Sequence, residues 1–215
     1  MQIKWFGHSS FLITSQNNLK IITDPYTSDS SLMYSPIHES ADIITISHSH
    51  GDHSNSSTIL GNPVILKEAG SKTIKGIQIK SITVFHDELG GSKRGKNLVF
   101  FFQIDNLNLC HLGDLGHVFN PEQLSEIGPV DILLIPVGGY FTINSREATL
   151  VSQSLNPKIV LPMHYKTPKT SFPISGIEEF LANKANIRKI NSNQIEISRD
   201  TLPPITEIIV LKYAN

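Results

Sequence analysis

The segment at positions 43–53 is IITISHSHGDH, which joins a short apolar run to three closely spaced histidines. The apolar run at 43–46 is bounded by polar residues, as is typical of a strand buried on both faces. His48 and His50 follow two residues apart, so in an extended backbone their imidazoles point the same way and can chelate one ion. Gly51 permits a sharp turn, after which Asp52 and His53 can face a second ion. The segment therefore predicts a metal site at the end of a strand.

Three further candidate ligands each follow an apolar run elsewhere in the chain. His86 follows the run at 82–85, and Asp114 and His164 come shortly after two others. Because α/β folds place ligands at the carboxyl ends of their strands, we expect these side chains to join the histidine-rich segment. Histidine and carboxylate sites with an open coordination position are typical of catalytic zinc. Two such ions can activate water and hold both reacting oxygens.

The hydrophobic pattern predicts strands and helices mixed along the whole length, and we expect a single α/β domain over residues 1–215. Helices are expected at 121–127, 145–155 and 177–185, the first capped by Asn120 and the second by Asn144 or Ser145. Strands are expected at 3–6, 10–14, 19–23, 43–46, 64–67, 77–85, 97–104, 107–112, 131–136, 158–161, 194–198 and 207–212. The last 40 residues are expected to complete the second sheet and its covering helix.

Composition excludes several classes of protein. The chain has 215 residues, 39% hydrophobic and 17% charged, which favours a packed core over disorder. A net charge of -1 does not favour binding of nucleic acid or anionic lipid by charge alone. Cys110 is the single cysteine, so no internal disulfide can form. The N-terminal residues lack a signal-peptide pattern and no apolar run is long enough to span a membrane, so we expect a cytoplasmic protein.

Five motifs occur in an order that resembles the metallo-β-lactamase superfamily. The central one, HSHGDH at 48–53, resembles the HxHxDH signature of that superfamily. The others are TDP at 23–25, FHD at 85–87, LGDLGH at 112–117 and LPMHY at 161–165. The segments GHSSF at 7–11 and PVGGY at 136–140 further resemble the branch that includes ascorbate-6-phosphate lactonase and N-acyl-phosphatidylethanolamine phospholipase D.

The resemblance implies an αββα sandwich, two mixed sheets flanked by helices, with two metal ions at one edge. It implies three ligands for the first ion, three for the second and one bridging residue: His48, His50 and His86; Asp52, His53 and His164; and Asp114. Asp24 would orient a ligand histidine. A hydroxide bridging the metals would be the nucleophile, and Asp52 would be the catalytic residue that handles its proton.

Four more residues are candidates for contact with substrate. His8 and His117 are expected near the site by their positions in the motifs, and Lys166 against a negatively charged substrate. Tyr140, with Phe141 beside it, either lines the pocket mouth or simply packs. The basic run at 93–96 has two interpretations, a solvated turn or a loop that contacts an anion above the site.

The expected function is therefore metal-dependent hydrolysis of a small-molecule ester-type bond, such as a phosphoester, lactone or amide. We expect two divalent ions, Zn²⁺ first and Mn²⁺ second, because mixed histidine and carboxylate sites accept either. The alternatives are a metal-dependent nuclease or phosphodiesterase of the same superfamily, and a non-catalytic metal-binding module. Di-iron redox members of the superfamily have an acidic residue where this chain has His50, which argues against redox chemistry.

Overall fold

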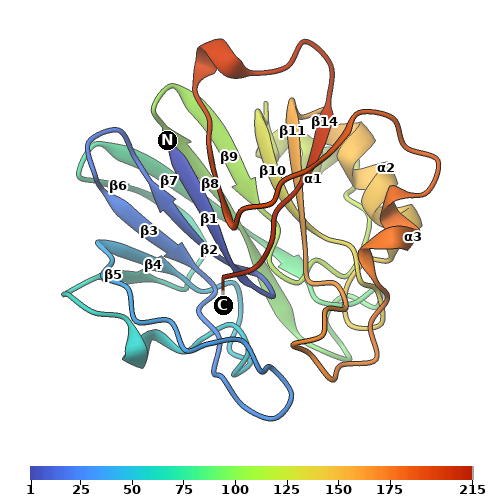
Figure 1. The fold of residues 1–215 in the computed structure, drawn as a ribbon, viewed down its shortest axis with the longest axis horizontal. Helices are drawn as coiled ribbons and strands as arrows, with labels where there is room; N and C mark the ends of the chain where they lie inside the picture. The colour runs from blue at the N-terminus through green and yellow to red at the C-terminus, as the bar shows by residue number, and fades with distance from the viewer. Residues whose placement is uncertain (215) are drawn as a thin grey trace.

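Two mixed β-sheets lie one against the other in the computed structural model, which describes residues 1–214 (Figure 1). The six-stranded sheet has the order β13-β1-β2-β3-β4-β5, and the eight-stranded sheet has the order β12-β14-β11-β10-β9-β8-β7-β6. The strands of the first sheet are β1 (Gln2–Gly7), β2 (Ser10–Thr14), β3 (Lys20–Thr23), β4 (Ile43–Thr45), β5 (Val64–Leu66) and β13 (Gln194–Glu196). Those of the second are β6 (Gly70–Ile74), β7 (Ile77–Phe85), β8 (Lys96–Ile104), β9 (Leu107–His111), β10 (Ile132–Pro136), β11 (Ile159–Met163), β12 (Ile187–Lys189) and β14 (Glu207–Val210).

Side chains along β3 and β4 alternate between the two faces of the six-stranded sheet, and both faces are buried at these strands. Ile21 and Ile43 pack into the cluster between the sheets. Their neighbours Ile22 and Ile44 point to the other face and join a separate apolar cluster. Successive strand residues point to opposite faces, so an apolar run at these positions requires cover on both sides.

Three α-helices lie in the described part of the chain: α1 (Pro121–Ile127), α2 (Ser145–Leu155) and α3 (Ile177–Leu181). The side chains of Asn120 and Asn144 cap α1 and α2 with reciprocal capping boxes. All three helices bury apolar residues in the larger core, and α2 and α3 lie side by side beyond β10 and β11 (Figure 1). None of these helices, within residues 1–214, has the length and apolar content that a bilayer crossing requires.

The second apolar cluster, on the outer face of the six-stranded sheet, is covered by loop residues. Tyr26, Leu32, Tyr34 and Ile37 from the segment between β3 and β4 pack there, with Ile59 from the end of the short 3-10 turn η1 (Ser56–Thr58). The predicted α/β sandwich of two mixed sheets is therefore confirmed. Its outer layer on this side is an ordered loop, whereas an α-helix was expected.

The remaining differences from the sequence-based expectation concern edges and the C-terminal region. The edge strand β6 was not predicted because all of its residues except Ile74 are exposed and mostly polar. The helix expected at 177–185 ends at Leu181. The last 40 residues serve both sheets, since β12 and β14 extend the eight-stranded sheet while β13 pairs with β1 in the other.

Candidate metal centre

The predicted ligands lie just beyond the carboxyl ends of strands from both sheets. His48, His86 and His164 follow β4, β7 and β11, and Asp114 follows β9. Within the eight-stranded sheet, β7, β9 and β11 run in the same direction. Strands β9, β10 and β11 pair in parallel, and both β7 and β9 are antiparallel to β8. The metal centre predicted at strand ends therefore corresponds to one edge of the sandwich.

Left-handed backbone bends turn several of these side chains toward one another. The φ angles of His8, Asp24 and His164 are +50°, +39° and +51°, a region that residues other than glycine seldom adopt. Each of the three follows the last residue of a strand, β1, β3 and β11. Such strain persists only where surrounding structure enforces it, and it clusters at functional sites.

Three overlapping groups of potential ligand atoms are brought together, each within 4.8 Å. The first contains His48, His50 and His86, which were predicted as the ligands of one ion. The second contains the predicted trio of the other ion together with one additional residue: Asp52, His53 and His164, with His8. The third contains His48, His53 and Asp114, so it joins members of both predicted sets. We call the first two the two ligand groups, and the roles of their residues as metal ligands stay a prediction.

Asp114 lies between the two groups. Its Oδ2 is 3.3 Å from Nε2 of His86 in the first group and 3.3 Å from Nε2 of His164 in the second. Its Oδ1 is 3.3 Å from Nε2 of His53. A carboxylate with oxygens facing both groups has the geometry that a bridging ligand needs.

The donor atoms themselves fit a bound cation. Buried side-chain nitrogens and oxygens normally have hydrogen-bond partners, and those that lack one require an explanation. Six side-chain atoms of the candidate ligands have none within residues 1–214: Nε2 of His48, Nε2 of His53, Nδ1 of His86, Oδ1 of Asp114, and Nδ1 and Nε2 of His164. Imidazole nitrogens and carboxylate oxygens are the donors that zinc and manganese bind, so the residues present suit a metal site.

Asp24 accepts hydrogen bonds that orient two of the candidate ligands. Its Oδ2 accepts a hydrogen bond from Nδ1 of His53 at 2.9 Å and another from Oγ of Ser47 at 2.6 Å. Ser47 Oγ lies 2.9 Å from Nδ1 of His48. Asp24 therefore orients one histidine directly and a second through Ser47, which leaves the Nε2 atom of each directed into the site.

Burial and neighbouring charges set the protonation states of the free side chains. Burial lowers the pKa of His48 to about 3 and that of His8 to about 4. Burial would raise the pKa of Asp114, but His164 and His53 outweigh it and hold that pKa well below its usual range. The converse holds for His53, whose pKa is raised by Asp114 and Asp52 against the effect of burial. Neutral imidazoles and ionised carboxylates are the forms that bind metal.

The model of the β-lactamase superfamily domain matches residues 2–164, which contain every residue of both groups. The chain belongs to the β-lactamase superfamily. A metal-dependent hydrolase of Carboxydothermus hydrogenoformans is 29% identical over 204 residues, covering 78% of this chain and 85% of the relative. Another, from Pyrobaculum calidifontis, is 31% identical over 196 residues with the same coverage.

A solved structure extends this likeness over nearly the whole chain. It is a Thermotoga maritima protein named as a zinc-dependent hydrolase of the metallo-β-lactamase superfamily, and it is 35% identical. The TM-score is 0.84, with 99% of each chain covered. The sequence-based prediction of a metal-dependent hydrolase of this superfamily is confirmed at the level of family and enzyme class.

The four residues predicted to contact substrate, His8, His117, Tyr140 and Lys166, have different surroundings. His8 is buried, and its Nε2 lies 3.1 Å from Oδ2 of Asp52, which makes it a neighbour of the ligands. Both ring nitrogens of His117 contact backbone groups, those of Phe85 and Val118. Lys166 donates to the backbone oxygen of Phe172. The side chain of Tyr140 is exposed.

A cavity of about 340 Å³ opens onto the ligands. Its lining includes four of the predicted ligands, His50, Asp52, His86 and Asp114. It also includes three residues that the motifs did not identify, Arg94, Phe141 and Phe172. His8, His117, Tyr140 and Lys166 are not among the lining residues. The basic run at 93–96 was the only signal in the sequence that pointed to Arg94.

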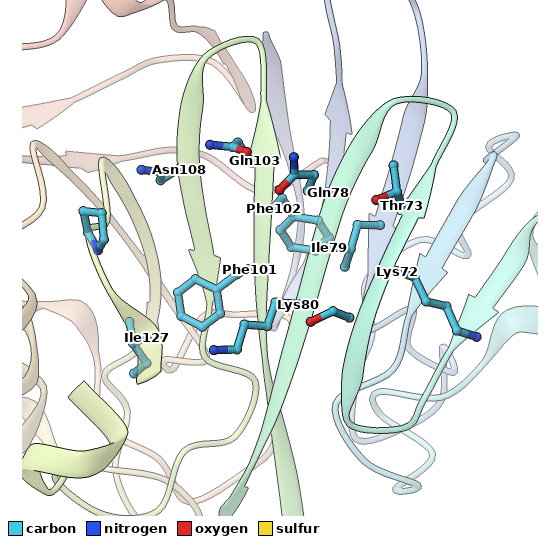
Figure 2. Close-up of a pocket in the computed structure, with 12 residues that line it drawn as sticks. Lys72, Thr73, Gln78, Ile79, Lys80, Phe101, Phe102, Gln103, Asn108 and Ile127 are labelled. Atoms are coloured by element: carbon cyan, nitrogen blue, oxygen red, sulfur yellow. The ribbon is translucent and has the colours of Figure 1, made fainter. Parts of the chain in front are cut away.

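A larger hollow of about 480 Å³ lies away from this centre, across β6, β7 and β8 beside the end of α1 (Figure 2). Phe101, Lys80 and Gln78 line it, together with Ile127. It contains none of the histidines or aspartates of the two ligand groups, so the candidate chemistry of the superfamily domain belongs to the smaller cavity.

Proposed function

We propose that the protein hydrolyses an ester-type bond of a small molecule, such as a phosphoester, lactone or amide, at a site that binds two divalent ions. The two ligand groups would each hold one ion and Asp114 would bridge them. The observation that carries this proposal is the convergence of unpartnered, buried imidazole nitrogens on the two sides of the Asp114 carboxylate. We propose Zn²⁺ as the metal, with Mn²⁺ second.

The chemistry that two bound divalent ions supply is a hydroxide nucleophile at neutral pH and an electrophile for the bond under attack. The protein residues hold and orient the groups around that reaction. Asp24 fixes the rings of His53 and, through Ser47, His48, so their free nitrogens cannot rotate away.

Asp52 is our candidate for the catalytic residue that accepts and returns a proton. Its carboxylate lines the cavity and is 23% exposed, so substrate and water can reach it. Burial would raise its pKa, but His53 and His8 outweigh that effect and keep the pKa below its usual range. The hydrogen bond with His8 at 3.1 Å also fixes its direction. An ionised, oriented and accessible carboxylate suits the role of a general base.

The size of the cavity favours a small-molecule substrate over a polymer. A volume of about 340 Å³ is near the lower end of the usual range for ligand pockets. The net charge of -1 supports the same choice, because nucleases bind the phosphate backbone through positive surface charge. The fold alone does not decide the reaction.

The first experiment measures metal per chain by elemental analysis and hydrolysis of three probes: bis(p-nitrophenyl) phosphate, a γ-lactone and p-nitrophenyl acetate. We expect about two metal ions per chain, as a two-ion site requires. His48→Ala and Asp114→Asn should lower metal content. Asp52→Asn should lower the hydrolysis rate of the loaded enzyme by about 100-fold or more.

The matched control is His38→Ala, because His38 is an exposed loop histidine outside both ligand groups and should leave metal content and rate unchanged. If the wild-type protein took up neither zinc nor manganese, the proposal would be wrong. Metal uptake without hydrolysis of any probe would favour a binding module, and cleavage of RNA without small-molecule turnover would favour the nuclease alternative.

A further inference from the structure

Arg94 places a positive charge in the cavity that contains the candidate metal ligands. Its guanidinium carbon lies 5.5 Å from the ring centroid of Phe141, and its Nη2 donates to the backbone oxygen of Tyr140 at 3.0 Å. Within residues 1–214, no carboxylate oxygen lies within 4.0 Å of its side-chain nitrogens. The charge is therefore held in place by neutral groups.

The loop that carries Arg94 is organised around the buried carboxylate of Asp87. Four backbone N–H groups donate to this carboxylate at 2.8–3.0 Å, those of Leu89, Gly91, Lys93 and Arg94. Asp87 directly follows His86, and the His86 N–H donates to the oxygen of Gly95, which closes the loop. Arg94 is thus fixed relative to a candidate metal ligand.

The neighbouring lysine shows that this placement is specific to Arg94. Lys93 is exposed, and its Nζ pairs with Glu88 at 2.8 Å in solvent. Lys93 is not among the lining residues of the cavity, whereas Arg94 is. Of the two interpretations of the basic run, the solvated turn describes Lys93, and a contact with an anion above the site fits Arg94.

The surroundings of Arg94 define what it could recognise. A guanidinium presents several N–H donors in a planar fork that matches a carboxylate or a phosphate, and the contact with Tyr140 uses only one nitrogen. Phe141 and Phe172 lie beside it with ring centroids 5.6 Å apart at an interplanar angle of 73°. These rings offer an apolar wall to the body of a small molecule, while the ligands line the rest of the cavity.

We propose that the substrate carries a compact oxyanion, a carboxylate or a phosphate group, which Arg94 binds while the bond to be cleaved faces the metal ligands. Arg94 is then a specificity-determining residue. This inference rests on the proposed function for the position of the scissile bond, but the anion site itself is built from Arg94, Phe141 and Phe172. The phosphate and carboxylate forms share one chemistry and are separated by the experiment.

The experiment measures binding of phenylphosphonate and of benzoate by titration calorimetry, with metal-free and with zinc-loaded protein. Four proteins are compared: wild type, Arg94→Gln, Arg94→Lys and the control Lys93→Ala. We expect Arg94→Gln to raise the Kd of at least one probe about tenfold or more, because a hydrogen bond to a charged group is lost. The Kd of Arg94→Lys should lie between those of wild type and Arg94→Gln, because lysine keeps the positive charge but lacks the planar fork of N–H donors.

Lys93→Ala should match wild type, and zinc content should be equal in all four proteins. An effect on phenylphosphonate alone would identify a phosphate-bearing substrate, and an effect on benzoate alone a carboxylate. Equal Kd values for both probes in wild type and Arg94→Gln would overturn the inference, as would the absence of binding by the wild type. If the wild type failed to bind zinc, the proposed function would fail, while the metal-free titrations would still decide the role of Arg94.

Discussion

Asp24 touches no cavity residue directly, yet its two carboxylate oxygens accept from Ser47 and His53 in the interior of the protein. An amide in its place has one accepting oxygen and one donating nitrogen. Such a nitrogen cannot accept from His53 or from the Ser47 hydroxyl. The orientation of two candidate ligands therefore depends on one oxygen of Asp24.

We expect Asp24→Asn to weaken zinc binding by roughly 10–100-fold, as is typical when a residue that orients a ligand is changed. The measurement is competition for zinc with a chromophoric chelator. The control is Asp42→Asn, since Asp42 pairs with Lys75 at the surface and lies outside both ligand groups. Unchanged affinity in Asp24→Asn would mean that Ser47 and the backbone are sufficient to hold the histidines.

At the level of single residues, sequence patterns indicated the candidate ligands of the cavity and pointed to Arg94 and Phe141, but gave no signal for Phe172. The ligands occur in short motifs at strand ends, where spacing has a direct geometric meaning. Phe141 and Phe172 occur in no such motif, and their approach depends on how two loops fold over the sheet edge. His117 was predicted as a contact because of its nearness in sequence to Asp114, but its ring turns toward the backbone of Phe85.

Among the secondary-structure elements, the turn after β9 is packed against the turn after β7. The N–H of Gly116 donates to the oxygen of Phe85 at 2.9 Å. A Cβ on Gly116 would lie 2.2 Å from the backbone nitrogen of Asp87 and 2.3 Å from the carbonyl carbon of His86. The two turns that carry His86 and Asp114 can approach this closely only with glycine at that position.

Gly116→Ala should therefore displace His86 and lower both metal content and the free energy of unfolding, the latter by about 1–3 kcal/mol, as for other overpacked sites. Gly51→Ala is the matched control, because a Cβ there meets nothing within 4 Å although Gly51 lies between two candidate ligands. Elemental analysis and urea unfolding check both. Gly51 is not among the residues with positive φ, so its backbone conformation is open to other residues.

The elements that the sequence did not predict are those with the weakest apolar pattern. Buried strands such as β10 and β11 are continuous apolar runs, and their bounds were predicted within one or two residues. The edge strand β6 has polar, exposed residues and forms because β7 offers free backbone groups beside it. The polar segment at 27–39 is a loop, as its composition predicts, but without a periodic pattern it gave no sign that it packs onto β1–β4.

On the scale of the whole molecule, the buried histidines make stability depend on pH. The pKa of His48 is about 3 and that of His8 about 4 in the folded protein, compared with about 6.5 in the unfolded chain. Between these limits the unfolded state binds more protons, so stability is full above pH 6.5 and falls as the pH drops toward 4. Each such histidine changes the free energy of unfolding by up to about 1.4 kcal/mol per pH unit in this range.

We expect the metal-free protein to lose stability steadily from pH 6.5 to pH 4, as measured by urea unfolding at several pH values after chelator treatment. His53 does not offset this trend, because its raised pKa keeps it protonated in both states over that range. His38 is exposed and lies outside both ligand groups, so His38→Ala serves as the control. A flat profile between pH 4 and 6.5 would contradict the burial of these rings.

The ligand groups also constrain the order of events during folding. His8 and His164 stand at opposite ends of the matched family region, yet their rings are 4.2 Å apart at the centroids. Bringing them together requires closure of a long loop and the docking of both sheets, which makes such contacts slow to form. We therefore expect metal capture by the completed set of candidate ligands to be a late kinetic step. A dye that reports the loss of free zinc during refolding would time the final assembly of the sandwich.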